Sequence, residues 1–351
     1  MKRYSKSIKI GNIFIGGENN ISVQSMTNTK TENISATVNQ IIELEDTGCD
    51  VVRVAVPNHD AASAIKNIKK MIKIPLVADI HFDYELAIES IKNGADKIRI
   101  NPGNIGDKSK LEKVVIAAKR SQIPIRIGIN AGSLEKSILE KYGSPSPDAM
   151  IESALTNIKL IESFEFDKIV VSIKSSNVSD TIESYTKLSK MIDYPLHLGI
   201  TESGTEKSGI IKSSIGIGCL LFQGIGDTIR VSLTGEPKKE IIVAKEILKS
   251  LGLLKNGIEI VSCPTCGRCN VDLINIANTI ENEINKFSTK KRIKIAVMGC
   301  AVNGPGEAKD ADIGIAGGKG EFLLFIKGKP IRKIPENGVI DEFIGEIKKL
   351  L

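Results

Sequence analysis

Four of the six cysteines lie between residues 263 and 300, and their spacing is typical of a metal site. Cys263, Cys266 and Cys269 occur at intervals of three in the segment CPTCGRC, and Cys300 follows in MGCAVNGPGE. Nothing at the start of the chain resembles a secretion signal, so we expect a cytoplasmic protein in which disulfides are disfavoured. Thiolates grouped in this way bind zinc or iron–sulfur clusters. The other two cysteines, Cys49 and Cys219, lie at apolar helix-like positions, and we expect both to be small buried hydrophobic residues.

The spacing favours an iron–sulfur cluster over a structural zinc site. A zinc ribbon needs two CxxC pairs, whereas Cys300 has no second cysteine near it. We therefore assign Cys263, Cys266 and Cys300 as cluster ligands. The fourth ligand is either Cys269 or Glu307, which follows Cys300 beyond an Asn-Gly-Pro-Gly turn. A carboxylate would hold its iron more weakly and leave it open to a substrate oxygen, and spacing alone does not choose between the two.

The residues before this cluster alternate between short apolar runs and amphipathic segments. Eight runs have strand character, and they begin at Ile21, Val51, Ile74, Lys97, Pro124, Lys168, Leu196 and Thr228. Segments of helical spacing such as SATVNQIIELEDTG separate them, and several end at a glycine. Eight such repeats over about 250 residues predict a parallel (β/α)₈ barrel of the TIM type. A doubly wound sheet is the alternative, but no GxGxxG segment follows the first strand.

The alternation of strand-like and helical segments ends near Asn256, where Lys-Asn-Gly is typical of a linker turn. A helix over 272–286, strands in KIAVMGC, DIGIAG and EFLLFIKG, and a last helix from Val339 predict a compact α+β domain. We therefore expect a substrate-binding barrel over residues 1–255 and a smaller iron–sulfur domain over residues 256–351.

Polar residues gather where the eight strands end, which is the functional face of this fold. Arg99 and Asn101 are two residues apart and share a face, as do Ser172 with Lys174 and Arg230 with Ser232. The Ile and Val residues between them face the helices, so the charged side chains should point into the barrel. The candidate mouth residues are Arg53, Asp79, His81, Arg99, Asn101, Arg126, Asn130, Ser172, Lys174, Glu202, Arg230 and Ser232.

Five of these are cations from five different strands, and only Asp79 and Glu202 offset their charge. A buried cation without a partner is costly, and guanidinium groups suit phosphate oxygens. We therefore expect a small anionic substrate, most simply a phosphate or diphosphate ester. The alternative is that these cations pair with the acids and stabilise the barrel. Glu202 and His81 are candidate acid–base residues, and Asp79 is a third candidate catalytic residue.

Composition excludes several other classes of protein. The net charge of +6 is spread along the chain rather than clustered, which argues against a nucleic-acid interface. No apolar run approaches the length of a membrane span. The 41% apolar residues suffice for real cores, and the absence of tryptophan means that Ile, Val, Leu and Ala must build them.

The chain resembles the bacterial two-domain 4-hydroxy-3-methylbut-2-enyl diphosphate synthases of the non-mevalonate isoprenoid pathway. Ten segments in order carry this resemblance: VQSMTNT, VVRVAVP, PLVADIHFD, ADKIRINPGNIG, RIGINAGSLE, VVSIKSS, LGITESG, GIGDTIRVSLTG, SCPTCGR and MGCAVNGPGEA.

The resemblance implies an iron–sulfur oxidoreductase that opens the ring of 2-C-methyl-D-erythritol 2,4-cyclodiphosphate and removes a hydroxyl group. Two electrons enter through a [4Fe-4S] cluster from flavodoxin or ferredoxin. The family's cluster ligands match Cys263, Cys266, Cys300 and Glu307. Its diphosphate contacts match Arg53, Arg99, Arg126 and Lys174, with Asn101, Asn130 and Ser232 nearby, and the residue matching Glu202 lies near the reacting hydroxyl groups. It also implies a homodimer in which the cluster domain of one subunit closes the other's barrel. Cys269 lies outside the family pattern.

Two other functions remain as alternatives. One is a barrel reductase or lyase that uses S-adenosylmethionine, but CxxxCxxC is absent. The other is a zinc-ribbon binding protein without enzyme activity.

Overall fold

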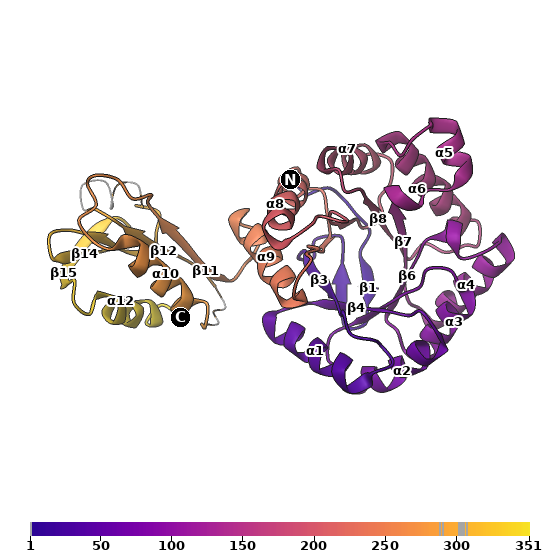
Figure 1. The fold of residues 1–351 in the computed structure, drawn as a ribbon, viewed down its shortest axis with the longest axis horizontal. Helices are drawn as coiled ribbons and strands as arrows, with labels where there is room; N and C mark the ends of the chain where they lie inside the picture. The colour runs from indigo at the N-terminus through magenta and orange to yellow at the C-terminus, as the bar shows by residue number, and fades with distance from the viewer. Residues whose placement is uncertain (1, 288, 290, 301–305, 307) are drawn as a thin grey trace. The chain divides into compact units, whose positions relative to one another are not determined.

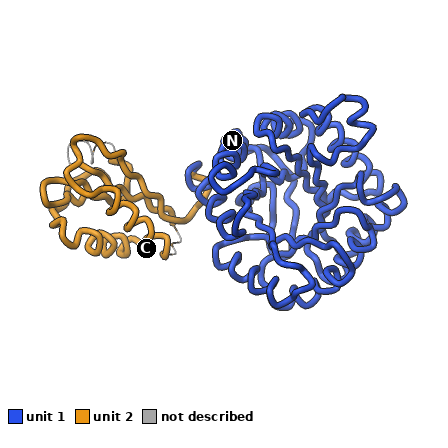
Figure 2. Tube along the Cα trace, in the orientation of Figure 1, with its two compact units in different colours: residues 1–251 blue, residues 252–351 orange. Residues whose placement is uncertain are grey.

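The computed structural model describes residues 2–287, 289, 291–300, 306 and 308–351, and it divides into two compact units. Unit 1 spans Met1–Leu251 and unit 2 spans Gly252–Leu351 (Figure 2). Within the residues described, no helix is both long and apolar enough to cross a membrane.

Unit 1 is a barrel of eight parallel strands. The strands lie in the order β8-β7-β6-β5-β4-β3-β10-β9, and an isolated parallel bridge between Val171 and Leu196 joins the two ends. Their bounds are β3 Ser22–Met26, β4 Val51–Ala55, β5 Leu76–Asp79, β6 Lys97–Ile100, β7 Ile125–Asn130, β8 Ile169–Lys174, β9 His197–Leu198 and β10 Thr228–Ile229. All eight correspond to predicted runs, so the predicted barrel is confirmed.

Helices surround these strands (Figure 1). They are α1 Ile34–Thr47, α2 His59–Lys69, α3 Tyr84–Lys92, α4 Lys108–Ser121, α5 Lys136–Tyr142, α6 Pro147–Glu162, α7 Val178–Leu188, α8 Glu206–Phe222 and α9 Pro237–Ser250. Side-chain caps start several of them: Asn33 accepts from the amide of Ala36, and Asn177 from that of Asp180. α1 ends at Gly48, whose φ of 94° suits only glycine.

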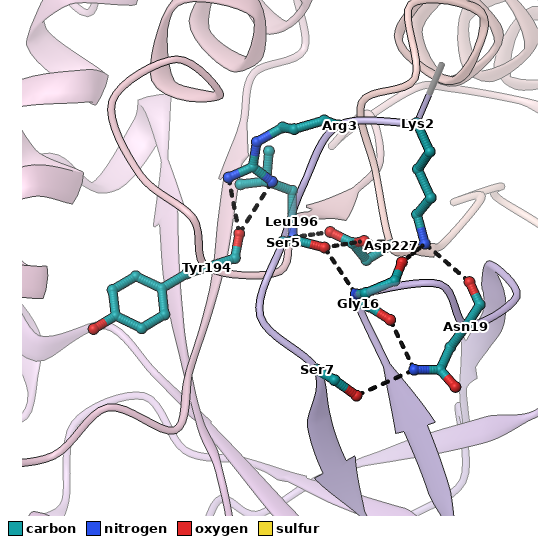
Figure 3. Close-up of polar contacts among 10 residues, drawn as sticks. Lys2, Arg3, Ser5, Ser7, Gly16, Asn19, Tyr194, Leu196 and Asp227 are labelled. Carbon is teal, nitrogen blue, oxygen red and sulfur yellow. Dashed lines mark hydrogen bonds and ion pairs between the residues drawn. The ribbon is translucent and has the colours of Figure 1, made fainter.

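An N-terminal hairpin that the sequence did not predict covers one end of the barrel. Strands β1 Ile8–Ile10 and β2 Ile13–Ile15 are antiparallel, and their Ile8, Ile10 and Ile15 pack with Val170 of β8. Polar contacts hold the preceding residues in place (Figure 3). Ser5 Oγ donates to Asp227 Oδ1 over 2.8 Å, and Asp227 Oδ2 accepts from the amide of Leu196 over 2.9 Å. The hairpin leaves the opposite end, where the strands finish, as the open one.

Unit 2 is a five-stranded mixed sheet with two described helices. The order is β11-β12-β13-β14-β15, with β11–β13 parallel and β13–β15 antiparallel. The bounds are β11 Gly257–Ser262, β12 Arg292–Met298, β13 Ile313–Gly317, β14 Glu321–Ile326, β15 Lys329–Pro335, α10 Leu273–Ile284 and α12 Val339–Lys348. Ile276 and Ile280 of α10 and Phe343 of α12 pack on the sheet. The sequence predicted β12–β14 and both helices and missed β11 and β15. β15 was missed because it is almost wholly exposed and lacks the apolar run that marks a buried strand.

Candidate functional site

A pocket at the carboxyl ends of the barrel strands collects most of the predicted mouth residues. Strands β4 to β8 and the segments after β5, β9 and β10 supply its side chains. Its lining residues are Arg53, Asp79, His81, Arg99, Arg126, Asn130, Ser172, Lys174, Thr201, Arg230 and Ser232. Parallel register explains the convergence, because Asp79 pairs with Arg99, Arg99 with Arg126, and Asn130 with Lys174.

Two glycines make room for the cations. A Cβ atom on Gly128 would lie 2.3 Å from Arg99 Nε, and one on Gly199 would lie 2.8 Å from Lys174 Nζ. Real Cβ atoms do not approach other atoms so closely, so a side chain at Gly128 would displace Arg99, and one at Gly199 would displace Lys174 and also press against the backbone oxygen of Arg230 at 2.6 Å. The sequence shows each glycine inside a strand-like run, in RIGIN and in LGIT, but only the fold reveals which cation each glycine accommodates.

Asp79 is the acid that organises the pocket. Its Oδ1 lies 3.1 Å from Arg99 NH1, and its Oδ2 lies 3.6 Å from both Arg53 Nε and His81 Nε2. Burial would raise the pKa of this carboxyl, but Arg53, hydrogen bonding to His81 and then Arg99 outweigh it and hold the pKa well below its usual range. Asp79 is therefore ionised and already shared among three partners.

The remaining positive charge has little compensation. Arg126 is 1% exposed, and its Nε and NH1 lack hydrogen-bond partners among the residues described. Burial, reinforced by neighbouring cations, lowers the pKa of Arg126 and Lys174 well below the usual values, and that of Arg53 to about 9. Burial costs of this size favour a bound anion with several oxygens.

Two predicted residues do not line this pocket. The side-chain amide of Asn101 donates to Ser133 O over 3.3 Å, and its Oδ1 accepts from the amide of Gly103, so Asn101 shapes the turn after β6. Glu202 is exposed in the turn after β9, with a φ of 49°. Thr201, its neighbour, lines the pocket instead and was not predicted.

Other residues that the sequence did not single out lie beneath or beside the pocket. Lys97 of β6 is fully buried, and its Nζ has no partner among the described side chains. Glu240 of α9 is also buried and lies 3.6 Å from Arg230 Nε. A charged residue inside a strand or on an amphipathic helix gives no sign by itself that it will be buried.

A second candidate site lies where β11 and β12 end. The two strands are parallel neighbours, so the segments that carry Cys263 and Cys300 leave the sheet at the same edge. The amide of Gly299 donates to Cys263 Sγ over 3.1 Å. Cys269 packs against the same glycine, since a Cβ on Gly299 would lie 2.8 Å from Cys269 Sγ.

The donor chemistry of this site fits an iron–sulfur cluster. Cys266 is exposed, and hydrogen bonds from the backbone and then the side chain of Arg268 lower the pKa of its thiol. That shift favours the thiolate that metals bind. Within the described ranges no three His, Cys, Asp or Glu side chains form a ready metal site, and the predicted ligand Glu307 lies outside those ranges.

Cys49 and Cys219 differ from each other in the structure. Cys49 is buried, as predicted. Cys219 is exposed, so the prediction that it is buried was wrong. It lies on α8, a helix apolar around much of its circumference, and the sequence pattern there did not indicate which face is covered.

Solved structures support the barrel fold. Dihydropteroate synthase from Stenotrophomonas maltophilia is 12% identical, with a TM-score of 0.53 over 71% of this chain and 97% of that chain. The enzyme from Xanthomonas albilineans is 13% identical, with a TM-score of 0.51 over 71% of this chain and 100% of that chain. At such identities the likeness concerns the fold alone.

Family comparisons cover both units. The GcpE TIM-barrel domain matches residues 5–245, and the GcpE protein C-terminal domain matches residues 259–349. The 4-hydroxy-3-methylbut-2-en-1-yl diphosphate synthase (flavodoxin) of Ruminiclostridium cellulolyticum is 60% identical over 99% of this chain and 98% of its own. The protein of that name from Caldicellulosiruptor saccharolyticus is 61% identical over 99% of both chains. The chain therefore belongs to the GcpE family of 4-hydroxy-3-methylbut-2-en-1-yl diphosphate synthases.

Proposed function

We propose that the chain reduces 2-C-methyl-D-erythritol 2,4-cyclodiphosphate to 4-hydroxy-3-methylbut-2-enyl diphosphate in isoprenoid precursor biosynthesis. The observation that carries the proposal is the pocket at the barrel mouth, where Arg53, Arg99, Arg126, Lys174 and Arg230 converge. Glu240 and the shared carboxylate of Asp79 offset only part of this charge. A diphosphate supplies the missing negative charge and several acceptor oxygens at once.

In this proposal the pocket residues contribute to diphosphate binding in different ways. Arg126 is the most buried of the pocket cations, and its Nε and NH1 offer free donors to the diphosphate. Asn130, Ser172 and Ser232 offer neutral hydrogen-bonding groups around them. Asp79 is saturated by Arg53, Arg99 and His81, so its role in the proposal is to orient these groups.

The proton-transfer roles belong to His81 and Glu202 in this proposal. The His81 side chain is 54% exposed and lies 3.2 Å from Arg99 NH1, so it can exchange protons with solvent while facing the pocket. Glu202 is exposed in the turn after β9 and directly follows Thr201, which lines the pocket. This position gives its carboxylate access to the mouth.

We propose a [4Fe-4S] cluster held by Cys263, Cys266, Cys300 and Glu307. When bound, such a cluster supplies electrons one at a time to a substrate at an open iron. Cys263 is oriented by the amide of Gly299, and Cys266 by its contacts with Arg268. The named relatives use flavodoxin, and we propose a flavodoxin, or a ferredoxin in its place, as the electron donor.

Anaerobic purification tests the cofactor directly. We expect brown protein with about four iron and four sulfide ions per chain, and reduction of the cyclodiphosphate with reduced flavodoxin. Colourless protein that holds one zinc ion would instead support the zinc-ribbon alternative. Among ligand variants, Cys269→Ser should keep the cluster spectrum and Glu307→Ala should change it. The reverse result would make Cys269 the fourth ligand.

We further propose a homodimer in which each pocket works with the cluster of the partner subunit. Mixing two inactive variants tests this arrangement. Arg126→Met removes a pocket cation, and Cys266→Ser removes a cluster ligand. Only a shared site allows a mixed dimer to contain one intact pocket paired with one intact cluster. Subunit exchange should therefore restore up to about a quarter of the wild-type activity. Dimers that form and stay inactive on mixing would refute the shared site.

A further inference from the structure

Glu240 is a buried carboxylate beside the pocket that the mechanism above does not use. It lies on α9 and is 5% exposed, yet it is not among the residues that line the pocket at the barrel mouth. Buried carboxylates require partners, because burial of an unpaired charge is costly. The partners of Glu240 therefore indicate what this side chain does.

Both oxygens of Glu240 contact the rim of the barrel. Oε1 accepts a hydrogen bond from the amide of Leu233 over 3.0 Å. Oε2 accepts from Ser25 Oγ over 3.2 Å and lies 3.6 Å from Arg230 Nε. Since Ser25 belongs to β3, one carboxylate joins α9, β3 and the segment that follows β10.

The segment held by Glu240 carries two lining residues. Arg230 and Ser232 both face the pocket, and Leu233 follows them directly. Because Glu240 lies at Nε of Arg230, the two terminal nitrogens of that guanidinium remain available for an anion. The carboxylate thus restricts the side chain without occupying its binding end.

The same segment supports the turn after β9. The amide of Thr234 donates to Gly204 O over 3.1 Å, and Ser203 Oγ donates to Ser232 O. A parallel bridge also joins Thr205 with Thr234. This turn contains Thr201, which lines the pocket, and Glu202. Contacts therefore run from Glu240 through residues 232–234 to the turn at residues 201–205.

We infer that Glu240 is a positioning residue, whose carboxylate holds Arg230 and the turn after β9 in the orientation that binds the diphosphate. This inference rests on the proposed function of the pocket. A positioning role predicts a change in anion affinity opposite to the change expected from charge alone. Removal of a negative charge near an anion site should tighten anion binding by electrostatics alone, whereas loss of a positioning contact should weaken it.

Glu240→Gln separates these effects. The amide oxygen of glutamine still accepts from Leu233, while its NH₂ group faces Arg230 and cannot pair with it. We expect the anaerobically purified holoenzyme to bind inorganic pyrophosphate roughly tenfold more weakly after this change, or about 1.4 kcal/mol, because the ion pair at 3.6 Å between Glu240 and Arg230 is lost. Glu246→Gln is the matched control, because Glu246 lies on the same helix and pairs with Lys249 on the exposed surface. It should bind as the wild type does.

A double-mutant cycle with Arg230→Met completes the test. If Glu240 acts through Arg230, Glu240→Gln should add little to the loss caused by Arg230→Met, whereas independent roles would give additive losses. Should Glu240→Gln fail to fold, Glu240→Asp keeps the charge and shortens the side chain, and it should weaken binding in the same way.

The outcomes distinguish the inference from the proposed function. Wild-type holoenzyme that binds no pyrophosphate would overturn both. Wild-type binding combined with unchanged or tighter binding by Glu240→Gln, or with additive losses in the cycle, would overturn only the role of Glu240. Weaker, non-additive binding supports it.

Discussion

Replacement of Asp79 by asparagine should destabilise the barrel strongly. The change keeps the shape of the side chain but removes the charge that Arg53 and Arg99 share. Removal of one partner from a buried ion pair costs about 3–5 kcal/mol, because the other charge stays buried without compensation. A domain of this size loses about 2–4 °C of melting temperature per kcal/mol, so we expect a decrease of roughly 6–20 °C.

The loss should also depend on pH in a defined direction. The folded chain holds the pKa of Asp79 below its unfolded value of about 3.9. The carboxylate therefore stabilises the fold fully above that value, and this stabilisation declines as the pH falls toward the folded pKa. Asp79→Asn has no such carboxylate. The difference in unfolding free energy between the wild type and the variant should therefore narrow from pH 5 to pH 3.

Urea unfolding followed by far-ultraviolet circular dichroism at pH 7, 5 and 3.5 measures both effects. Asp193→Asn is the control, because Asp193 forms an exposed ion pair with Lys6 at 3.7 Å, and such pairs contribute about 0–1 kcal/mol. Two results would refute the assignment of Asp79 as the shared counter-charge. One is a loss of unfolding free energy for Asp79→Asn no larger than that of the control. The other is a difference in unfolding free energy from the wild type that stays constant down to pH 3.5.

Three further predictions concern buried residues of the barrel. Lys97→Met should stabilise the chain by about 1–3 kcal/mol at pH 7. Because burial lowers the pKa of Lys97, the unfolded chain binds this proton more tightly than the folded chain does, and the gain in unfolding free energy measured with urea should shrink toward pH 10. Gly128→Ala should displace Arg99 and weaken pyrophosphate binding about tenfold or more by calorimetry, and unchanged affinity would contradict the close approach. Tyr185→Phe, which removes a hydroxyl that donates to His197 O and accepts from the amide of Ile173, should cost about 1–3 kcal/mol in thermal melts and leave pyrophosphate affinity intact.

Local sequence pattern was sufficient for the barrel and for most of its mouth. A strand alternates its side chains with a period of two, so charged residues spaced by two among Ile and Val must share the inner face. That rule predicted Arg126 and Lys174 as inward cations, and the parallel register then brought them together. The cysteine spacing likewise predicted a thiolate site without reference to the strands of unit 2.

Pattern was insufficient where a chain segment leaves a strand or where packing covers a helix. Asn101 and Glu202 follow their strands by only a few residues, yet neither lines the pocket, whereas Thr201 does. β15 has no apolar run and forms only because β14 pairs with it.

The sequence by itself determined the repeating β/α plan, the inward cations and the group of thiols, because each depends on residue type and short-range periodicity. Tertiary structure alone decided that Glu240 meets Ser25 and Arg230, that Gly128 makes room for Arg99, and that Cys263 lies beside the turn before Cys300. These contacts join residues far apart in the chain. Their distances follow from strand register and helix packing, which no local pattern encodes.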